Sequence, residues 1–188
     1  MKKGKLIIIS GPSGVGKSTI REKIINNNKN FWYSVSMTTR KPRTTENHGI
    51  DYFFVSKKEF LKNIESNNLI EYAQVYNGDF YGTPKDEVFK KLENGIHVLL
   101  EIDVEGALIV KEKFPEVVLI FIMAPSMEEL EKRLTNRYTD TKEKIIERLE
   151  KAKIEVTFKE KYDYIVINNS VDETVLDITN IIESEMKK

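Results

Sequence analysis

A glycine-rich turn between an apolar strand and a helix limits the possible folds of this chain more than any other feature. Residues 6–10 form an isoleucine-rich run typical of a strand buried on both faces, and a helical pattern follows residue 18. The turn between them, GPSGVGKS, fits the pattern G-x-x-x-x-G-K-[ST], in which backbone N–H groups converge on phosphate oxygens. In this pattern Lys17 reaches the β- and γ-phosphates, and the Ser18 hydroxyl is a ligand of Mg²⁺. The sequence therefore predicts that a nucleoside triphosphate is bound by Gly11, Pro12, Ser13, Gly14, Val15, Gly16, Lys17 and Ser18.

Strand-like and helix-like segments alternate along most of the chain. Apolar runs at residues 98–102, 117–123 and 164–167 are each followed by a helical pattern or a helix start. One of these starts, at Ser126, has the form of a capping box. Strands that alternate with helices indicate βαβ units, so we predict an α/β fold with a mostly parallel sheet.

Two segments interrupt this alternation. Residues 36–95 contain a helix capped by Ser56 and a hairpin signal at Asn77-Gly78. In the same segment, Thr83-Pro84 is predicted to provide the N-cap and first residue of a further helix. Residues 126–161 are mostly helical in pattern and very charged. The sequence therefore predicts one core with two insertions rather than two independent domains.

The composition excludes several classes of protein. Basic and acidic side chains are equal in number, at 30 each, which argues against a general binder of nucleic acids or membrane surfaces. The absence of cysteine excludes a disulfide framework and a thiolate metal site. The apolar runs are too short to span a bilayer, and the N-terminus does not have the pattern of a signal peptide. We therefore expect a cytoplasmic protein.

The arginines are few and unevenly placed. The 30 basic residues comprise 24 lysines and six arginines. Codon bias explains this ratio but not the positions, because Arg40 and Arg43 lie in one short loop while Arg133, Arg137 and Arg148 lie in another segment. Arginine offers paired, planar donors that lysine lacks, and these suit phosphate oxygens.

Several longer strings of residues resemble the guanylate kinase family. They are SVSMTTRKPR at 34–43, GIDYFFV at 49–55, LIEY at 69–72, YGT at 81–83, EIDVEGA at 101–107 and R-L-x-x-R-x-T-D at 133–140. The strings follow one another in the order of that family, and S-x-T-T-R-x-P-R is specific to it. The resemblance implies a single guanylate-kinase-like domain of about residues 4–184.

The resemblance also implies an architecture and a reaction. We expect a P-loop NTPase-like, three-layer core with a mostly parallel sheet, an inserted mixed α+β subdomain that binds GMP, and a helical lid. The expected activity is Mg²⁺-dependent, in-line phosphoryl transfer, ATP + GMP = ADP + GDP, in purine nucleotide metabolism and GMP recycling. The expected partners are ATP and GMP, without nucleic acid or membrane, and the expected protein is a monomer or homodimer. The core would comprise residues 1–35, 96–125 and 162–188, the GMP-binding subdomain residues 36–95, and the lid residues 126–161.

In the family, separate groups of residues bind the phosphate and the base of GMP. By resemblance, a carboxylate at Glu71 accepts the N1–H and amino group of guanine, and the Thr83 hydroxyl donates to O6. Asp103 approaches the guanine amino group and, together with Ser18, provides the link to Mg²⁺. Glu101 points to the same face as Asp103 and is a further candidate. The GMP phosphate would be held by Ser36, Arg40, Arg43, Tyr52 and Tyr81.

The remaining roles concern ATP. By resemblance, Arg133, Arg137 and Arg148 belong to the lid and meet the ATP phosphates. With Lys17 they would act as catalytic residues, because phosphoryl transfer needs positive charge where negative charge shifts between oxygens. Asn168 matches a position near the adenine ring. Of the six arginines, Arg21 alone has no counterpart that faces a substrate phosphate.

Three alternatives remain open on the residues themselves. A GTPase switch is compatible with the D-x-x-G pattern at residues 103–106, but the chain lacks an N-K-x-D element. A non-enzymatic peptide-binding module resembles the same family but typically lacks a complete phosphate loop. Adenylate or thymidylate kinase chemistry shares the loop but not the S-x-T-T-R string. Each predicts a different response to GMP.

Overall fold

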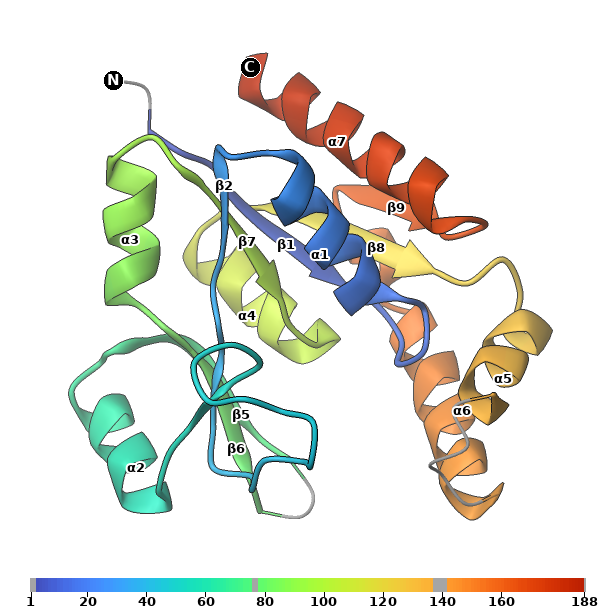
Figure 1. Ribbon diagram of the computed structural model, residues 1–188, viewed down its shortest axis with the longest axis horizontal. Coiled ribbons are helices and arrows are strands. Elements are labelled where there is room, and N and C mark those ends of the chain that lie inside the picture. The colour runs from blue at the N-terminus through green and yellow to red at the C-terminus, as the bar shows by residue number, and fades with distance from the viewer. Residues whose placement is uncertain (1–2, 76–77, 137–141, 188) are drawn as a thin grey trace.

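Two β-sheets form the framework of the protein (Figure 1). The structure is a computed structural model that describes residues 3–75, 78–136 and 142–187. A five-stranded sheet has the order β2-β7-β1-β8-β9, and a four-stranded sheet has the order β4-β3-β6-β5. The strands are β1 (Leu6–Ser10), β2 (Phe31–Tyr33), β3 (Met37–Thr38), β4 (Phe53–Phe54), β5 (Leu69–Gln74), β6 (Phe80–Pro84), β7 (His97–Glu101), β8 (Val118–Met123) and β9 (Tyr164–Ile167). The helices are α1 (Lys17–Asn27), α2 (Lys57–Glu65), α3 (Asp86–Glu93), α4 (Val104–Lys113), α5 (Met127–Thr135), α6 (Lys142–Val156), the short 3₁₀ helix η1 (Lys159–Lys161) and α7 (Val171–Lys187).

The larger sheet is parallel throughout. β1 lies at its centre and pairs with β7 and β8, while β2 and β9 form the edges. This confirms the predicted α/β fold and its mostly parallel sheet. The sequence reasoning missed β2, because three residues are too short for a periodicity to be recognised. All five carboxyl ends lie at one edge of the sheet, since the strands run in the same direction.

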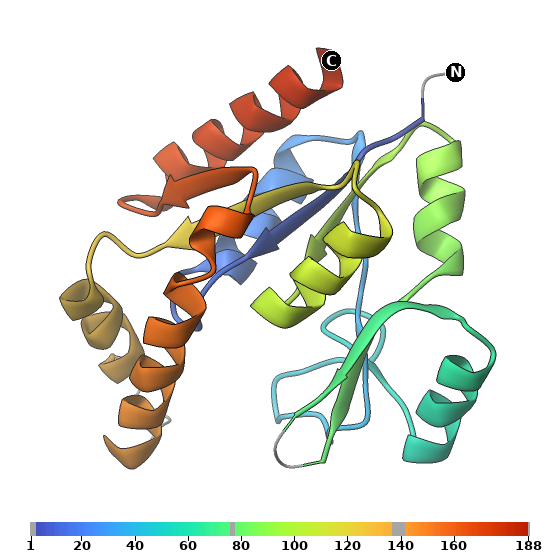
Figure 2. The ribbon, with the colours of Figure 1, turned by 180° about the vertical axis from the view of Figure 1, so that it is seen from behind.

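Helices cover both faces of this sheet and give it three layers (Figures 1 and 2). Alternate residues of β1 enter different clusters, because successive side chains point to opposite faces. Ile7 and Ile9 pack in one cluster with buried residues of α1 and α7. Leu6 and Ile8 pack in the other with buried residues of α3 and α4. The two faces are therefore both apolar, as a continuous apolar strand requires.

The smaller sheet lies within the first insertion. The Ser56 hydroxyl accepts the Glu59 N–H at 3.2 Å and caps α2, as predicted. β5 and β6 pair antiparallel, as the hairpin signal predicts, although Asn77 lies outside the described residues. The prediction for Thr83-Pro84 was wrong, because both residues belong to β6. Proline is tolerated there since it ends the strand, and α3 begins at Asp86.

The second insertion contains α5 and α6. Ser126 caps α5 by accepting the Glu129 N–H at 3.2 Å, which confirms the capping box. Leu130 and Leu134 anchor α5 in the cluster shared by α1 and α7. Figure 2 shows the smaller sheet with α2 on one side of the molecule and α5 with α6 on the other, both beyond the carboxyl ends of the parallel strands, while α3 packs along the larger sheet. This arrangement leaves the carboxyl edge of the sheet between them.

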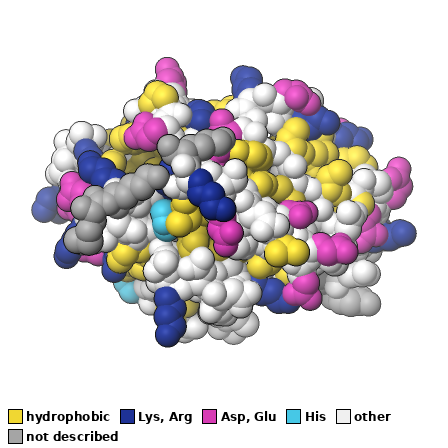
Figure 3. All heavy atoms as spheres, turned by 90° about the horizontal axis from the view of Figure 1, so that it is seen from above, with side chains coloured by type: hydrophobic (Ala, Val, Ile, Leu, Met, Phe, Trp, Pro, Cys, Tyr) yellow, Lys and Arg dark blue, Asp and Glu magenta, His cyan; other side chains and the backbone are white. Residues whose placement is uncertain are grey.

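The charged side chains are spread over the surface. On the face drawn in Figure 3, basic and acidic side chains are interspersed, as expected for equal numbers of the two. Within residues 3–75, 78–136 and 142–187, no helix has both the length and the apolar character needed to cross a membrane.

Candidate functional site

The candidate residues meet at the carboxyl edge of the parallel sheet. The phosphate loop follows β1, Glu101 ends β7, and Asn168 follows β9. In open parallel sheets, ligands bind outside the carboxyl ends of the strands, where neighbouring loops diverge. The topology therefore brings together residues that are up to about 150 positions apart in the sequence, such as Val15 and Asn168.

The phosphate loop wraps around the N-terminus of α1. Gly16 is the N-cap and has φ +93°, a conformation that residues with a Cβ rarely adopt. A Cβ at Gly16 would also lie 2.8 Å from Nδ2 of Asn168. Lys17 Nζ donates to the carbonyl oxygens of Gly11 at 2.6 Å and Pro12 at 2.9 Å. The lysine side chain thus folds back over its own loop, where its ammonium group joins the positive end of the helix dipole.

Ser18 meets a carboxylate of the adjacent strand. Its Oγ donates to Oε1 of Glu101 at 2.9 Å. Oε2 of the same carboxylate accepts Nη1 of Arg21 at 3.2 Å. The acidic partner that the structure brings to Ser18 is therefore Glu101, which the sequence analysis treated as a further candidate. Asp103 instead caps α4, where Oδ1 accepts the Gly106 N–H at 2.8 Å.

A second group of candidate residues lies in and around the loop after β3. Arg40 donates Nη1 and Nη2 to the two oxygens of Glu46, both at 2.8 Å. Its Nε donates to the Tyr81 hydroxyl at 3.0 Å, and Nη1 also donates to the Lys41 carbonyl at 2.7 Å. These bonds use four of the five guanidinium N–H groups. Arg40 is consequently held in one orientation by Lys41 and Glu46 of the loop and by Tyr81 of β6.

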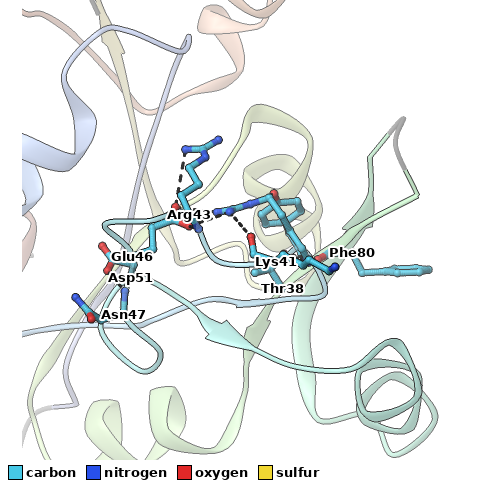
Figure 4. Close-up of polar contacts among 9 residues, drawn as sticks. Thr38, Lys41, Arg43, Glu46, Asn47, Asp51 and Phe80 are labelled. Atoms are coloured by element: carbon cyan, nitrogen blue, oxygen red, sulfur yellow. Dashed lines mark hydrogen bonds and ion pairs between the residues drawn. The ribbon is translucent and has the colours of Figure 1, made fainter. Parts of the chain in front are cut away.

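The side chain of Arg43 is more exposed and less tightly bonded than that of Arg40. Its side chain is 70% exposed, against 16% for Arg40, and its ion pair with Glu46 is long at 3.8 Å. Figure 4 shows Arg43 and Glu46 beside each other in this loop, joined by a dashed line. The hydrogen bond with Arg40 and a bond from the Arg43 backbone N–H lower the pKa of Glu46, so its carboxylate stays ionised.

Tyrosine rings form a wall beside Arg40. The Arg40 guanidinium lies 5.5 Å from the centre of the Tyr52 ring, and the Tyr52 and Tyr81 rings meet edge to face at 5.8 Å. Burial raises the pKa of Tyr52, which keeps its hydroxyl neutral and able to donate. Ser36 is buried nearby at the end of the loop between β2 and β3. The predicted phosphate-binding residues after β2 and in the smaller sheet are thus neighbours.

Glu71 is a buried carboxylate on β5. Its side chain is 5% exposed, and Oε1 accepts the Thr83 hydroxyl at 2.7 Å. Burial raises the pKa of Glu71 to about 7, with a further contribution from the charge of Asp103. Gly106 allows this approach, because a Cβ there would lie 3.1 Å from Glu71 and 3.2 Å from Asp103. The carboxylates of Glu71 and Asp103 therefore lie close together beside Gly106, and the Thr83 hydroxyl donates its hydrogen bond to Glu71.

Arg133 links the second insertion to the loop after β9. Arg133 donates Nε to Glu129 at 3.0 Å and Nη2 to the carbonyl of Asn168 at 3.1 Å. Arg148 lies half-buried on α6. Arg137, the third predicted lid arginine, lies outside the described residues. The structure therefore joins Arg133 to the loop after β9.

Asn168 connects the lid to the phosphate loop. Its side chain is 3% exposed, with Nδ2 donating to the Val15 carbonyl at 2.7 Å and Oδ1 accepting the Thr174 hydroxyl at 3.0 Å. Both ends of the amide are thus bonded within the protein. The prediction that Asn168 lies near an adenine ring stays a prediction, and in the structure its side chain bonds Val15 of the phosphate loop and Thr174 of α7.

Sequence reasoning missed two features of the site. It did not single out Glu46, although a lone carboxylate three residues after Arg43 in a basic loop is a detectable signal. It assigned no role to Arg21, which contacts Glu101. A helical spacing of three residues places Arg21 on the same side of α1 as Ser18, but the sequence alone does not tell which strand this side faces.

The sequence and the fold are similar to those of known proteins. A family model described as guanylate kinase matches residues 3–185. The guanylate kinase of Caldanaerobacter subterraneus subsp. tengcongensis is 51% identical over 184 residues, which is 98% of this chain and 89% of that protein. The guanylate kinase of Clostridium tetani is 49% identical over 185 residues, which is 98% of this chain and 88% of that protein. The crystal structure of guanylate kinase from Anaplasma phagocytophilum matches 100% of this chain and 88% of its own, with a TM-score of 0.83 and 37% identity.

Proposed function

The chain belongs to the guanylate kinase family of nucleoside monophosphate kinases, as its sequence motifs predicted, and we propose on that premise that it transfers the γ-phosphoryl group of ATP to GMP. The observation that supports the proposal is the presence of two separate clusters of basic side chains and hydrogen-bond donors among the candidate residues. One is the phosphate loop at α1, and the other is the Arg40–Arg43 loop beside the smaller sheet. A phosphoryl transfer between two nucleotides requires two such clusters facing one another.

The second of these clusters suits the phosphate of a nucleoside monophosphate. Arg40 is fixed by Glu46 and Tyr81, so it offers a preoriented charge with one N–H still available. Arg43 is exposed and can turn toward an incoming dianion. The hydroxyls of Ser36, Tyr52 and Tyr81 complete a set of donors for the phosphate oxygens.

The carboxylates near β5 suit the base of GMP. Guanine presents two N–H donors on one edge, and the ionised Glu71 carboxylate can accept both. Adenine presents a donor and an acceptor there, so it would leave a buried carboxylate oxygen unpaired. Asp103 is close enough to Glu71 for its charge to raise the pKa of that carboxyl. The Thr83 hydroxyl orients the Glu71 carboxylate.

The phosphate loop suits ATP with Mg²⁺. Ser18 and Glu101 provide two oxygen atoms at 2.9 Å from each other beside the loop, and oxygen ligands are those that Mg²⁺ prefers. We propose that Ser18 and Glu101 hold the cation, with Asp103 retained for the guanine. When bound, Mg²⁺ neutralises charge on the transferred and leaving oxygens.

The two insertions would close the site around the substrates. We propose that residues 36–95 form the GMP-binding subdomain and residues 126–161 the lid. Lys17, Arg133, Arg137 and Arg148 would then surround the transferred phosphoryl group with positive charge. Closure excludes water, which would otherwise accept the phosphoryl group in place of GMP.

The proposed function is tested by the choice of phosphate acceptor. ADP formation from ATP and Mg²⁺ is measured with GMP, dGMP, AMP, CMP, UMP and dTMP under the same conditions. We expect GMP to exceed AMP by at least about 10³-fold in kcat/KM, because AMP leaves buried groups unpaired. A failure to form ADP when GMP is the acceptor would contradict the proposal. Hydrolysis of GTP without added GMP would favour a GTPase.

The exposure of the two loop arginines predicts different effects for the same change. Arg43→Lys should raise the KM for GMP about tenfold and leave the melting temperature unchanged, because the side chain is 70% exposed. Arg40→Lys should raise the same KM and also destabilise the protein by about 1–3 kcal/mol, because it loses the paired bonds to Glu46. KM for ATP serves as the internal control. Equal loss of stability in the two variants would contradict the assignment.

The raised pKa of Glu71 predicts a pH dependence. Only the ionised carboxylate accepts two N–H groups, and with a pKa of about 7 its ionised fraction rises from about one tenth at pH 6 to about nine tenths at pH 8. The dissociation constant of GMP should therefore fall about tenfold over this range. Because the GMP phosphate itself titrates near pH 6, the Glu71→Gln variant is measured in parallel as the reference. The same slope in both proteins would contradict the prediction.

A further inference from the structure

Arg21 lies in the phosphate-loop site although the motifs give it no role. It follows Ser18 by three residues on α1, so the two side chains leave the helix on one side. Ser18 Oγ donates to Oε1 of Glu101 at 2.9 Å, and Arg21 Nη1 donates to Oε2 at 3.2 Å. The Glu101 carboxylate is thus bonded through both oxygens to one helix.

The Arg21 side chain is itself held in place. Its guanidinium carbon lies 4.2 Å from the centre of the Tyr33 ring on β2, the edge strand next to β7. Its second terminal nitrogen donates to the exposed carboxylate of Glu22 at 3.1 Å. The Arg21 and Glu101 side chains are each 15% exposed, so the ion pair is largely shielded from solvent. The stack on Tyr33 suits a guanidinium, whereas the ion pair with Glu101 requires only the positive charge.

The position of Arg21 matters because its partner, Glu101, lies beside the phosphate loop. A carboxylate within hydrogen-bond distance of the Ser18 hydroxyl is close to where the phosphate loop places a polyphosphate. Without a counter-ion, its negative charge would oppose nucleotide binding, and the effect would be greatest when no divalent cation is present. Arg21 is the cation that the structure pairs with it.

We propose that Arg21 is a positioning residue that acts as the counter-ion of Glu101, so that the phosphate loop binds a nucleoside triphosphate even in the absence of a divalent cation. The inference rests on the proposed binding of ATP at this loop. It assigns Arg21 a role through Glu101 rather than through contact with the nucleotide. Tyr33 would keep the guanidinium over the carboxylate.

The test measures ATP binding by calorimetry in EDTA and in Mg²⁺, without GMP and without turnover. Arg21→Gln should weaken binding in EDTA about tenfold and change binding in Mg²⁺ by at most about twofold, because the cation then compensates Glu101. Glu101→Gln should tighten binding in EDTA, since Arg21 is left facing the phosphates. The variant that combines Arg21→Gln with Glu101→Gln should bind ATP in EDTA with an affinity within about threefold of the unchanged protein. Arg21→Lys keeps the positive charge, so its affinity should also stay within about threefold.

Lys23→Gln is the matched control. It removes one positive charge from the same helix, but Lys23 pairs with the exposed Asp172, away from Glu101, and binding in EDTA should not change. Equal weakening by Arg21→Gln in EDTA and Mg²⁺ would indicate a purely structural role and overturn the proposal. If Arg21→Gln does not fold, a Glu101→Gln variant with unchanged affinity in EDTA also overturns it. Failure of the unchanged protein to bind ATP in either buffer would instead overturn the proposed function, and this inference with it.

Discussion

Replacing Lys17 with alanine is expected to reduce kcat by about 10²–10³-fold while leaving the fold intact. Lys17 Nζ contacts the backbone carbonyls of Gly11 and Pro12, so its ammonium group is held at the mouth of the phosphate loop. The lost charge would act on oxygens that become more negative during transfer, which makes the effect larger on kcat than on the KM for GMP. Steady-state kinetics with ATP and GMP measure both constants.

The stability of this variant separates the two roles that a lysine can have. The Lys17 side chain is not among the buried residues of the three apolar clusters. We therefore expect the melting temperature of Lys17→Ala to stay within a few degrees of the unchanged protein. Lys23→Ala, a change at a half-buried lysine on the same helix that pairs with Asp172, should retain full activity. A loss of native circular dichroism in Lys17→Ala would show that the lysine is structural.

Replacing Glu71 with glutamine is expected to lower kcat/KM for GMP by about 10²–10³-fold. Glutamine has nearly the same shape and can still accept the Thr83 hydroxyl, but its NH₂ group would face an N–H of guanine. The KM for ATP should not change, because Glu71 belongs to β5 and the phosphate loop follows β1. Kinetics with each substrate varied in turn distinguish these effects.

The same change should increase stability at alkaline pH. The folded protein holds a carboxyl with a pKa of about 7 in place of the usual 4.5, so it binds more protons than the unfolded chain between these values. The contribution of Glu71 to the free energy of unfolding therefore falls as the pH rises from about 4.5 to about 7, and above pH 7 the destabilisation has reached its full size. Glutamine carries no such cost, so Glu71→Gln should melt higher than the unchanged protein at pH 8. Glu65→Gln, an exposed change in the same insertion, should alter neither property.

Most of the architecture was predictable because its signals are local. Residues 6–10 and 164–167 are apolar runs that predict strands, and the capping serines Ser56 and Ser126 mark helix starts within a few residues. The errors arose where local and long-range signals compete. Thr83-Pro84 has the local pattern of a helix start, but pairing of β6 with β5 and β3 prevails over that pattern.

The site was predictable as a set of residues rather than as a set of contacts. Motif spacing identified Ser18, but its acidic partner depends on the register between β1 and β7, which no single segment encodes. Likewise, Glu46 and Arg21 act on residues that are themselves within motifs, and neither belongs to one. Residues that orient other residues leave a weaker sequence signal than residues that contact a ligand.

The bond from Asn168 to Val15 has a consequence for the order in which the chain acquires its properties during synthesis. The phosphate loop is synthesised about 150 residues before the side chain that holds its backbone. β9 is also an edge strand that pairs with β8 alone among the strands of its sheet. A nascent chain without residues 164–187 therefore contains the phosphate loop but lacks the hydrogen bond from Asn168 that holds it. Tight nucleotide binding should therefore emerge only after residues 164–187 have been synthesised and β9 and α7 have docked.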